Sequence, residues 1–279
     1  MFAYRFPTWA GTLPRVTETG FAESRDGTIV GYETAGAGPP LVLVHGAAAD
    51  RRCWAPVLPR LAERFTVHAL DRRGRGLSAR EGGPYAIERE GEDIAAVAEA
   101  AGGDVFLVGH SYGALCSLHA AAATDAIARL VLYEPPITTP WHEAASPEAL
   151  ARLREIADEG DHDRLLAAVF RDLMGLSRRQ VDALRGARRF WAACLGNAPP
   201  LVRESGSVPR IEGCSRFAGI GVPVRLLVGE TSPPYQRATA DALARIVPGA
   251  EVVELPGQGH MAMADDPGLF AKALATFAE

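Results

Sequence analysis

The segment GHSYG, residues 109–113, places a serine between two glycines, with the apolar run VFLV (105–108) before it and an alanine-rich stretch after it. A G-x-S-x-G turn between a strand and a helix holds the central serine in a strained conformation that projects its hydroxyl above the sheet. Because this context is the one that the motif needs, we predict that Ser111 is a nucleophile. The alternative interpretation is a glycine-rich turn with an incidental serine.

A serine hydroxyl needs a neighbouring base to become a good nucleophile. Of the seven histidines, His260 is best placed, because its segment GQGH (257–260) follows the last apolar run and precedes the last helical pattern. Such a loop lies at the same end of a parallel sheet as Ser111. We therefore predict that His260 is the base.

Two backbone N–H groups are expected to face the same point. The run LVLVH (41–45) is followed by Gly46 and Ala47, where a turn can direct the N–H of Ala47 toward Ser111. The N–H of Tyr112 comes directly after the serine. Two such donors would stabilise the oxyanion of a tetrahedral intermediate, whereas the alternative at Ala47 is an ordinary turn that ends a strand.

The elements that must position these groups are short, nearly continuous apolar runs, which is the pattern of strands buried on both faces of a parallel sheet. Ahead of them, residues 21–36 have the pattern of a hairpin with Asp26-Gly27 at its turn. The apolar runs lie at 41–45, 65–70, 105–109, 129–133, 224–229 and 251–255. Helical patterns lie between or after them at 53–64, 87–101, 113–124, 236–247 and 267–278. This alternation predicts an α/β fold with right-handed crossovers.

The alternation stops between about residues 135 and 222, where helical patterns follow one another. One of them opens with a capping box at Ser177 and Gln180 and is expected to continue as a single helix to Cys194. A helical insertion between two strands of one sheet is typical of a cap over the strand ends. We predict one α/β core, residues 1–136 and 222–279, with an all-helical cap inserted at 137–221.

Five large side chains of the predicted cap are candidates for lining a substrate pocket: Trp141, Phe170, Met174, Phe190 and Trp191. Amphipathic helices bury such residues in any case, so packing against the core is the alternative for each of them.

Composition excludes several classes of function. A net charge of −5 gives no reason to expect a nucleic-acid partner, and no stretch approaches the length of a membrane span. The four cysteines lack C-x-x-C spacing, which favours neither a metal site nor a disulfide framework. The pattern G-x-G-x-x-A at 74–79 is followed by helix-breaking residues, so it does not predict dinucleotide binding. We expect a cytoplasmic protein with no cofactor that acts on a small molecule.

The segments LVLVHG (41–46), DRRGRGLS (71–78), GHSYGA (109–114) and GQGH (257–260), in that order, resemble the α/β-hydrolase superfamily. The closest resemblance is to capped serine hydrolases of the esterase-like type. It implies an α/β-hydrolase fold, with a mostly parallel eight-stranded sheet flanked by helices and a catalytic triad in the chain order nucleophile, acid, histidine.

The sequence departs from that family at the acid. Many relatives have an aspartate in the turn after the penultimate strand, but the corresponding turn here, GETSPP (229–234), contains none. Glu134, directly after the run at 129–133, and Glu230, within that turn, are the remaining candidates. The acid must reach the second imidazole nitrogen to fix its tautomer. We favour Glu134 over Glu230, and a triad with neither of them is the third alternative.

These residues predict a serine hydrolase that cleaves a small carboxylic ester, thioester or lactone through an acyl-enzyme. The first alternative is an enzyme of the same fold with a non-hydrolytic or carbon–carbon bond reaction, such as a cyclase, a lyase or an acyltransferase. The second is a non-catalytic ligand-binding module.

Overall fold

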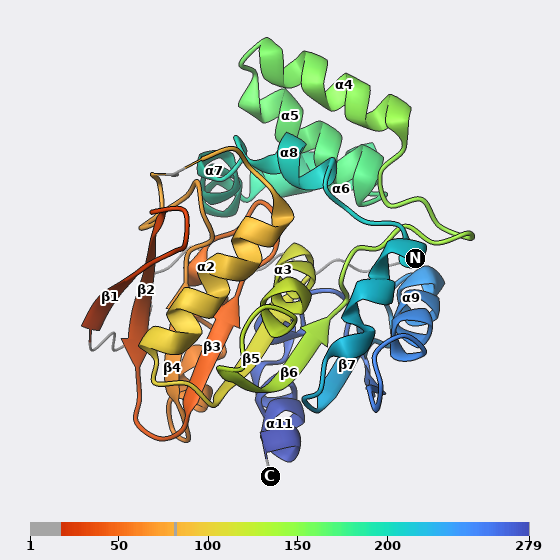
Figure 1. Cartoon of the computed structure of the whole chain (residues 1–279). Helices are drawn as coiled ribbons and strands as arrows, with labels where there is room; N and C mark the ends of the chain where they lie inside the picture. The colour runs from red at the N-terminus through yellow and green to blue at the C-terminus, as the bar shows by residue number, and fades with distance from the viewer. Residues whose placement is uncertain (1–17, 81–82, 279) are drawn as a thin grey trace.

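The computed structural model describes residues 18–80 and 83–278, and within these ranges eight strands form one sheet in the order β1-β2-β4-β3-β5-β6-β7-β8 (Figure 1). The strands are β1 (Glu18–Glu23), β2 (Ile29–Ala35), β3 (Pro40–Val44), β4 (Thr66–Leu70), β5 (Val105–His110), β6 (Ile127–Tyr133), β7 (Val224–Gly229) and β8 (Glu251–Leu255). β2 pairs antiparallel with both β1 and β4, and the remaining neighbours pair in parallel. The predicted α/β-hydrolase fold with its mostly parallel sheet is therefore confirmed.

The hairpin at the start of the sheet forms at the predicted turn. Gly27 has φ +81°, a backbone conformation that favours glycine. The Asp26 carboxylate accepts the N–H of Thr28 at 3.0 Å and so stabilises the turn locally.

Helices cover both faces of the sheet. Alternate residues of a strand point to opposite faces, so each central strand packs against helices on both sides. The core helices are η1 (Arg51–Trp54), α1 (Leu58–Leu61), α2 (Ile87–Ala100), α3 (Tyr112–Ala121), α9 (Pro234–Ala244), α10 (Ala262–Asp265) and α11 (Pro267–Ala278). Leu41 and Leu43 of β3 pack in one cluster with α1 and α11, whereas Val42 and Val44 pack in a second cluster with α2, α3 and α9. Burial on both faces explains why the strands are nearly continuous apolar runs.

The prediction of a single helix over residues 53–64 is wrong. The chain forms the short 3₁₀ helix η1 and the one-turn helix α1 instead, with Pro56 between them and Pro59 in the first turn of α1. Proline lacks the N–H that a continuous helix would need at these positions.

Only helices lie between β6 and β7 in the chain, and Figure 1 shows most of them above the carboxyl ends of the strands. They are α4 (Pro147–Asp158), α5 (His162–Ala168), the π-helix η2 (Val169–Leu173), α6 (Arg178–Gly186), α7 (Arg188–Gly196), α8 (Leu201–Ser205) and the 3₁₀ helix η3 (Ile211–Gly219). We refer to residues 137–221 as the cap segment. No helix in the described part of the chain is long and apolar enough to cross a membrane.

The capping box of α6 forms as predicted, since the Ser177 and Gln180 side chains each bond the backbone of the other residue. The prediction of one helix from there to Cys194 is wrong. Ala187 has φ −77° and ψ 68°, outside the helical region, and this residue separates α6 from α7.

Candidate active site

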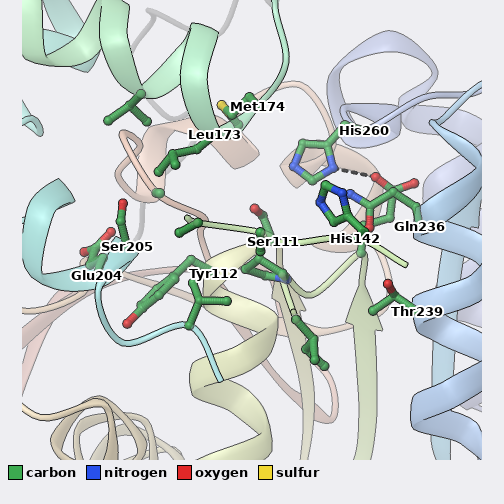
Figure 2. Close-up of a pocket in the computed structure, with 18 of the residues that line it drawn as sticks. Ser111, Tyr112, His142, Leu173, Met174, Glu204, Ser205, Gln236, Thr239 and His260 are labelled. Atoms are coloured by element: carbon green, nitrogen blue, oxygen red, sulfur yellow. Dashed lines mark hydrogen bonds and ion pairs between the residues drawn. The ribbon is translucent and has the colours of Figure 1, made fainter. Parts of the chain in front are cut away.

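Ser111 occupies a sharp turn between β5 and α3 and has φ 53° and ψ −124° (Figure 2). Its neighbours explain the glycines of the motif. A Cβ on Gly109 would lie 2.6 Å from Ala114 Cα, and one on Gly113 would lie 2.4 Å from His45 O. The Ser111 N–H donates to Tyr133 O of the adjacent strand at 2.8 Å, which anchors the turn to β6. A strained non-glycine conformation of this kind persists only where its surroundings enforce it.

His260 and Glu134 meet beside this turn. His260 Nδ1 lies 2.5 Å from Glu134 Oε2, and Glu134 Oε1 accepts the N–H of Gly229 at 2.9 Å. The Glu134 side chain is fully buried, and its residue has φ 47° directly after β6. Both carboxylate oxygens are therefore held, which fixes the direction in which the carboxylate faces the imidazole.

Glu230, the alternative acid, lies elsewhere. It is exposed, and its carboxylate accepts the N–H of Gly257 at 2.6 Å. The structure thus brings Glu134, and not Glu230, to the ring of His260.

The loop that holds His260 is anchored through its backbone. His110 Nε2 lies 2.9 Å from His260 O, and because a carbonyl only accepts, this nitrogen of His110 is the protonated one. Burial and the neighbouring His260 lower the pKa of His110, so its ring is neutral. The Tyr133 hydroxyl donates to Gly259 O and accepts the N–H of Ala262, which ties the loop to β6.

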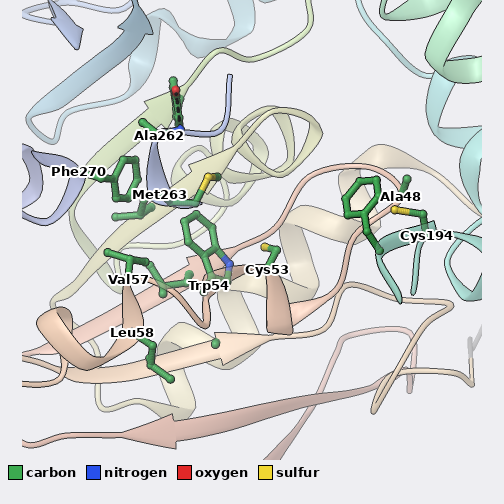
Figure 3. Close-up of a cluster of buried hydrophobic side chains, with 14 of the residues drawn as sticks. Ala48, Cys53, Trp54, Val57, Leu58, Cys194, Ala262, Met263 and Phe270 are labelled. Carbon is green, nitrogen blue, oxygen red and sulfur yellow. Dashed lines mark hydrogen bonds between the residues drawn. The ribbon is translucent and has the colours of Figure 1, made fainter. Parts of the chain in front are cut away.

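A buried apolar cluster supports the same loop from below (Figure 3). Trp54 of η1 packs against Phe270 of α11 with ring centroids 6.2 Å apart, and both side chains are fully buried. Met263 of α10, just after His260, belongs to the same cluster. Replacing large aromatic core residues of this kind by alanine typically destabilises a fold by about 3–5 kcal/mol, so we expect this cluster to stabilise the packing beneath the loop.

The predicted oxyanion donors lie close to Ser111. A Cβ on Gly46 would lie 3.0 Å from Ser111 Cβ, which shows how near the Gly46–Ala47 peptide passes to the serine. Tyr112 is the first residue of α3, where the helical N–H groups have no partner within the helix. Ala47 and Tyr112 both line a cavity together with Ser111 and His260.

Two cavities meet at this point. The first, of about 120 Å³, contains polar side chains beside its apolar wall, among them those of His142, Glu204, Ser205, Gln236 and Thr239 (Figure 2). The second, of about 70 Å³, has an almost wholly apolar lining that includes Leu176, Leu184, Phe190 and Cys194. Ala47, Ser111, Met174 and His260 line both cavities. A carbonyl group held at Ser111 could therefore direct one substituent into each of them.

Of the five aromatic and sulfur-containing side chains predicted for the pocket, Met174 lines both cavities, and Phe170 and Phe190 line the apolar one. The structure places Trp141 and Trp191 at neither. Trp141 is 52% exposed, and the indole N–H of Trp191 donates to Asp163 Oδ1 at 2.7 Å within the cap segment.

Sequence reasoning missed a buried ionic cluster beside the first cavity. Arg72 and Arg75, in the segment DRRGRGLS (71–78), both donate to Glu204 of the cap segment, and Arg72 also binds Glu90. Both arginines belong to a segment that the sequence singles out, but Glu204 lies in no motif and its partners are more than a hundred residues away.

Comparison with known proteins identifies the family of the chain. Residues 41–273 match the model of the alpha/beta hydrolase family. The chain is 28% identical to the 2-(acetamidomethylene)succinate hydrolase of Mesorhizobium japonicum over 87% of this chain and 88% of that protein. It is 30% identical to the N-formylmaleamate deformylase of Pseudomonas putida over 85% of this chain and 87% of that protein.

Among solved structures, an alpha/beta hydrolase from Sphaerobacter thermophilus superimposes with a TM-score of 0.84 at 36% identity, covering 93% of this chain and all of that one. The chain belongs to the alpha/beta hydrolase family and is a hydrolase of the α/β-hydrolase fold.

Proposed function

We propose that the protein hydrolyses a small carboxylic ester, thioester or lactone through a Ser111–His260–Glu134 triad. The observation that supports this most directly is the 2.5 Å contact between His260 Nδ1 and Glu134 Oε2 beside a serine in a strained strand-to-helix turn. Ser111 and His260 line the same two cavities, and Figure 2 shows both among the side chains that line the first.

In this proposal Ser111 Oγ attacks the carbonyl carbon while His260 Nε2 takes the hydroxyl proton. The carbonyl oxygen becomes negatively charged and accepts hydrogen bonds from the N–H groups of Ala47 and Tyr112. Glu134 keeps the Nδ1 proton of His260 in place and stabilises the imidazolium. Collapse of the intermediate breaks the bond to the leaving group, which receives the proton from His260.

Deacylation repeats these steps with water. His260 takes a proton from the water as its oxygen attacks the acyl carbon, and it then returns a proton to Ser111 Oγ as the acid leaves. No cofactor enters this scheme, and the small cavities favour a compact substrate. The four cysteines are buried free thiols, which agrees with the cytoplasmic location that we keep as part of the proposal.

A second type of bond has specific support. One relative is named for removing a formyl group from an N-formyl compound, and its sequence aligns with most of this chain. We therefore include acyl–nitrogen bonds among the candidate substrates, and paired assays with p-nitrophenyl esters and N-formyl amides would rank the two classes.

Labelling with a fluorophosphonate tests the nucleophile directly. We expect one adduct on Ser111, located by mass spectrometry, and none on Ser205, which lines the same cavity but donates its hydroxyl to Leu201 O. Ser111→Ala should abolish the adduct and lower kcat on p-nitrophenyl esters by about 10⁵–10⁶. Wild-type turnover by this variant would refute the proposal, and labelling without any hydrolysis would favour the non-hydrolytic alternative.

A further inference from the structure

The peptide between Gly46 and Ala47 is held by a chain of buried polar side chains that ends in the cap segment. We propose that His45, Arg72 and Glu204 are positioning residues that orient the Ala47 N–H toward the oxyanion, with Glu204 linking this orientation to the cap segment. The inference rests on the proposed function, because it assigns a purpose to groups around the proposed oxyanion donors.

The geometry of one peptide unit is the first step. The carbonyl of Gly46 and the N–H of Ala47 belong to the same planar trans peptide, so they point in opposite directions. Gly46 O accepts from His45 Nδ1 at 2.8 Å and from Arg72 Nη1 at 3.3 Å. Two donors that fix this carbonyl on one side therefore also fix the direction of the N–H on the other.

His45 is suited to this purpose because both of its ring nitrogens are occupied. Gly46 O can only accept, so Nδ1 is the protonated nitrogen, and Nε2 accepts the backbone N–H of Arg72 at 3.1 Å. Burial, with the charges of Arg75 and Arg72, holds the pKa of His45 well below its usual range. The neutral ring thus links the end of β3 to the loop after β4 through two hydrogen bonds.

Arg72 contacts the surroundings of both proposed oxyanion donors. Its guanidinium donates to Gly46 O, and it also lies 4.7 Å from the centroid of the Tyr112 ring. The side chain is fully buried and is paired with Glu90 through Nε at 2.9 Å and Nη2 at 2.6 Å. A buried guanidinium needs such partners, and the fork geometry leaves Nη1 directed at the peptide.

Glu204 supplies the remaining partner and comes from the cap segment. Its Oε1 accepts hydrogen bonds from Arg72 Nη2 at 2.8 Å and from Arg75 Nη2. Arg72 and Glu204 are 132 residues apart in the sequence. Glu204 is 1% exposed and lines the first cavity, where Figure 2 shows it across Ser111 from His260. A shift of α8 would remove one of the two carboxylates that balance Arg72, and Arg72 would then be free to leave Gly46 O.

The test must separate orientation of the oxyanion peptide from stability of the fold. A trifluoromethyl ketone labelled with ¹³C at its carbonyl adds to Ser111 as a hemiketal, and a ¹³C titration gives the pKa of the hemiketal hydroxyl. Donors that stabilise the oxyanion lower this pKa. Loss of the Glu204 charge without any change in the Gly46–Ala47 peptide would also lower it, so only a reoriented peptide would raise it. The variant is Glu204→Gln, which keeps the shape and removes the charge.

We expect Glu204→Gln to raise the hemiketal pKa by about 1 unit and to lower kcat about tenfold, with KM changed less than about twofold. The matched control is Glu88→Gln, which removes the exposed pair between Glu88 of α2 and Arg216 of the cap segment without touching Arg72. It should leave the hemiketal pKa and kcat unchanged. If Glu204→Gln fails to fold, Glu204→Asp keeps the charge, shortens the reach and should give a smaller change in the same direction.

An unchanged hemiketal pKa in a folded Glu204 variant would overturn the inference, even if its melting temperature fell. So would an equal change in Glu88→Gln, because the effect would then belong to any cap contact. A wild-type protein that forms no Ser111 hemiketal would overturn the proposed function and this inference with it, so the two failures are distinguished by the wild-type spectrum alone.

Discussion

Replacing Glu134 by glutamine removes one charge at the candidate triad and almost no volume. Glu134 Oε1 accepts the N–H of Gly229, so the amide oxygen of glutamine should take that position and its NH₂ group should face His260 Nδ1. Two donors cannot bond each other, so His260 would turn to the tautomer with Nδ1 unprotonated. Its Nε2 would then carry the proton and could not accept one from Ser111.

The size of the effect follows from this change of tautomer. The corresponding replacement in serine proteases lowers kcat about 10⁴-fold. At about 1.36 kcal/mol for each factor of ten, that is about 5.4 kcal/mol of transition-state stabilisation. We expect a fall of about 10³–10⁴ in kcat for Glu134→Gln, with little change in KM.

Glu230→Gln is the matched control, because its amide oxygen can still accept the N–H of Gly257. As an exposed change it should alter kcat by no more than about twofold. Steady-state kinetics on a p-nitrophenyl ester would measure both variants, with circular dichroism to show that each is folded. If folded Glu134→Gln kept more than about 1% of wild-type kcat, or if Glu230→Gln lost as much as Glu134→Gln, the assignment of the acid would be wrong.

Two further predictions concern stability. Gly113→Ala should destabilise the fold by about 1–3 kcal/mol in urea unfolding, because its Cβ would lie 2.4 Å from His45 O, whereas Gly186→Ala, with open space around it, should not be destabilising. Burial lowers the pKa of His45 and of His110 in the folded chain, while in the unfolded chain both titrate near 6.5. The unfolded state therefore binds more protons below about pH 6.5, and the free energy of unfolding should fall by about 1.4 kcal/mol for each of the two rings between pH 7.5 and 5.5. If the free energy of unfolding were equal at these two pH values, the two buried rings would not be neutral in the folded chain. The proposed contacts of His110 with His260 O and of His45 with Gly46 O would then need to be revised.

The parallel strands were predictable because burial on both faces leaves a direct trace in sequence, a run of apolar residues with little alternation. The strand-to-helix turn at Ser111 was predictable for a similar reason, since the glycines that its geometry requires are local. Both signals act over a few residues, so a single sequence contains them in full.

Contacts between distant segments leave no such trace. Glu134 follows a strand at which the sequence offers no motif, and its pairing with His260 depends on how two loops 126 residues apart meet. The same holds for Glu204, because the sequence around it gives no sign that its side chain binds the buried guanidinium of Arg72. Trp141 and Trp191 lie away from both cavities for a similar reason, because the sequence does not show whether an aromatic side chain of the cap segment is exposed, as Trp141 is, or bonded within that segment, as Trp191 is.

The positions of backbone strain connect the fold to the candidate site. Ala48, Ser111 and Glu134 are three of the four non-glycine residues with positive φ in the described part of the chain. Each follows the carboxyl end of β3, β5 or β6, and these strands are neighbours in the sheet. Such conformations cost about 1–3 kcal/mol each, so they persist only where the surrounding structure imposes them.

The surrounding structure here is a set of fully buried parallel strands whose hydrogen bonds continue into the strained residues. The Ser111 N–H donates to Tyr133 O, and the Glu134 N–H donates to Leu227 O at 3.2 Å, so each turn is tied to the next strand of the sheet. These hydrogen bonds thus fix the backbone from which the proposed nucleophile and the proposed acid project. The Gly46–Ala47 peptide lies beyond the end of β3, and its carbonyl is held by the side chains of His45 and Arg72. In the inference proposed above, Glu204 makes this peptide the part of the candidate site that the cap segment can influence.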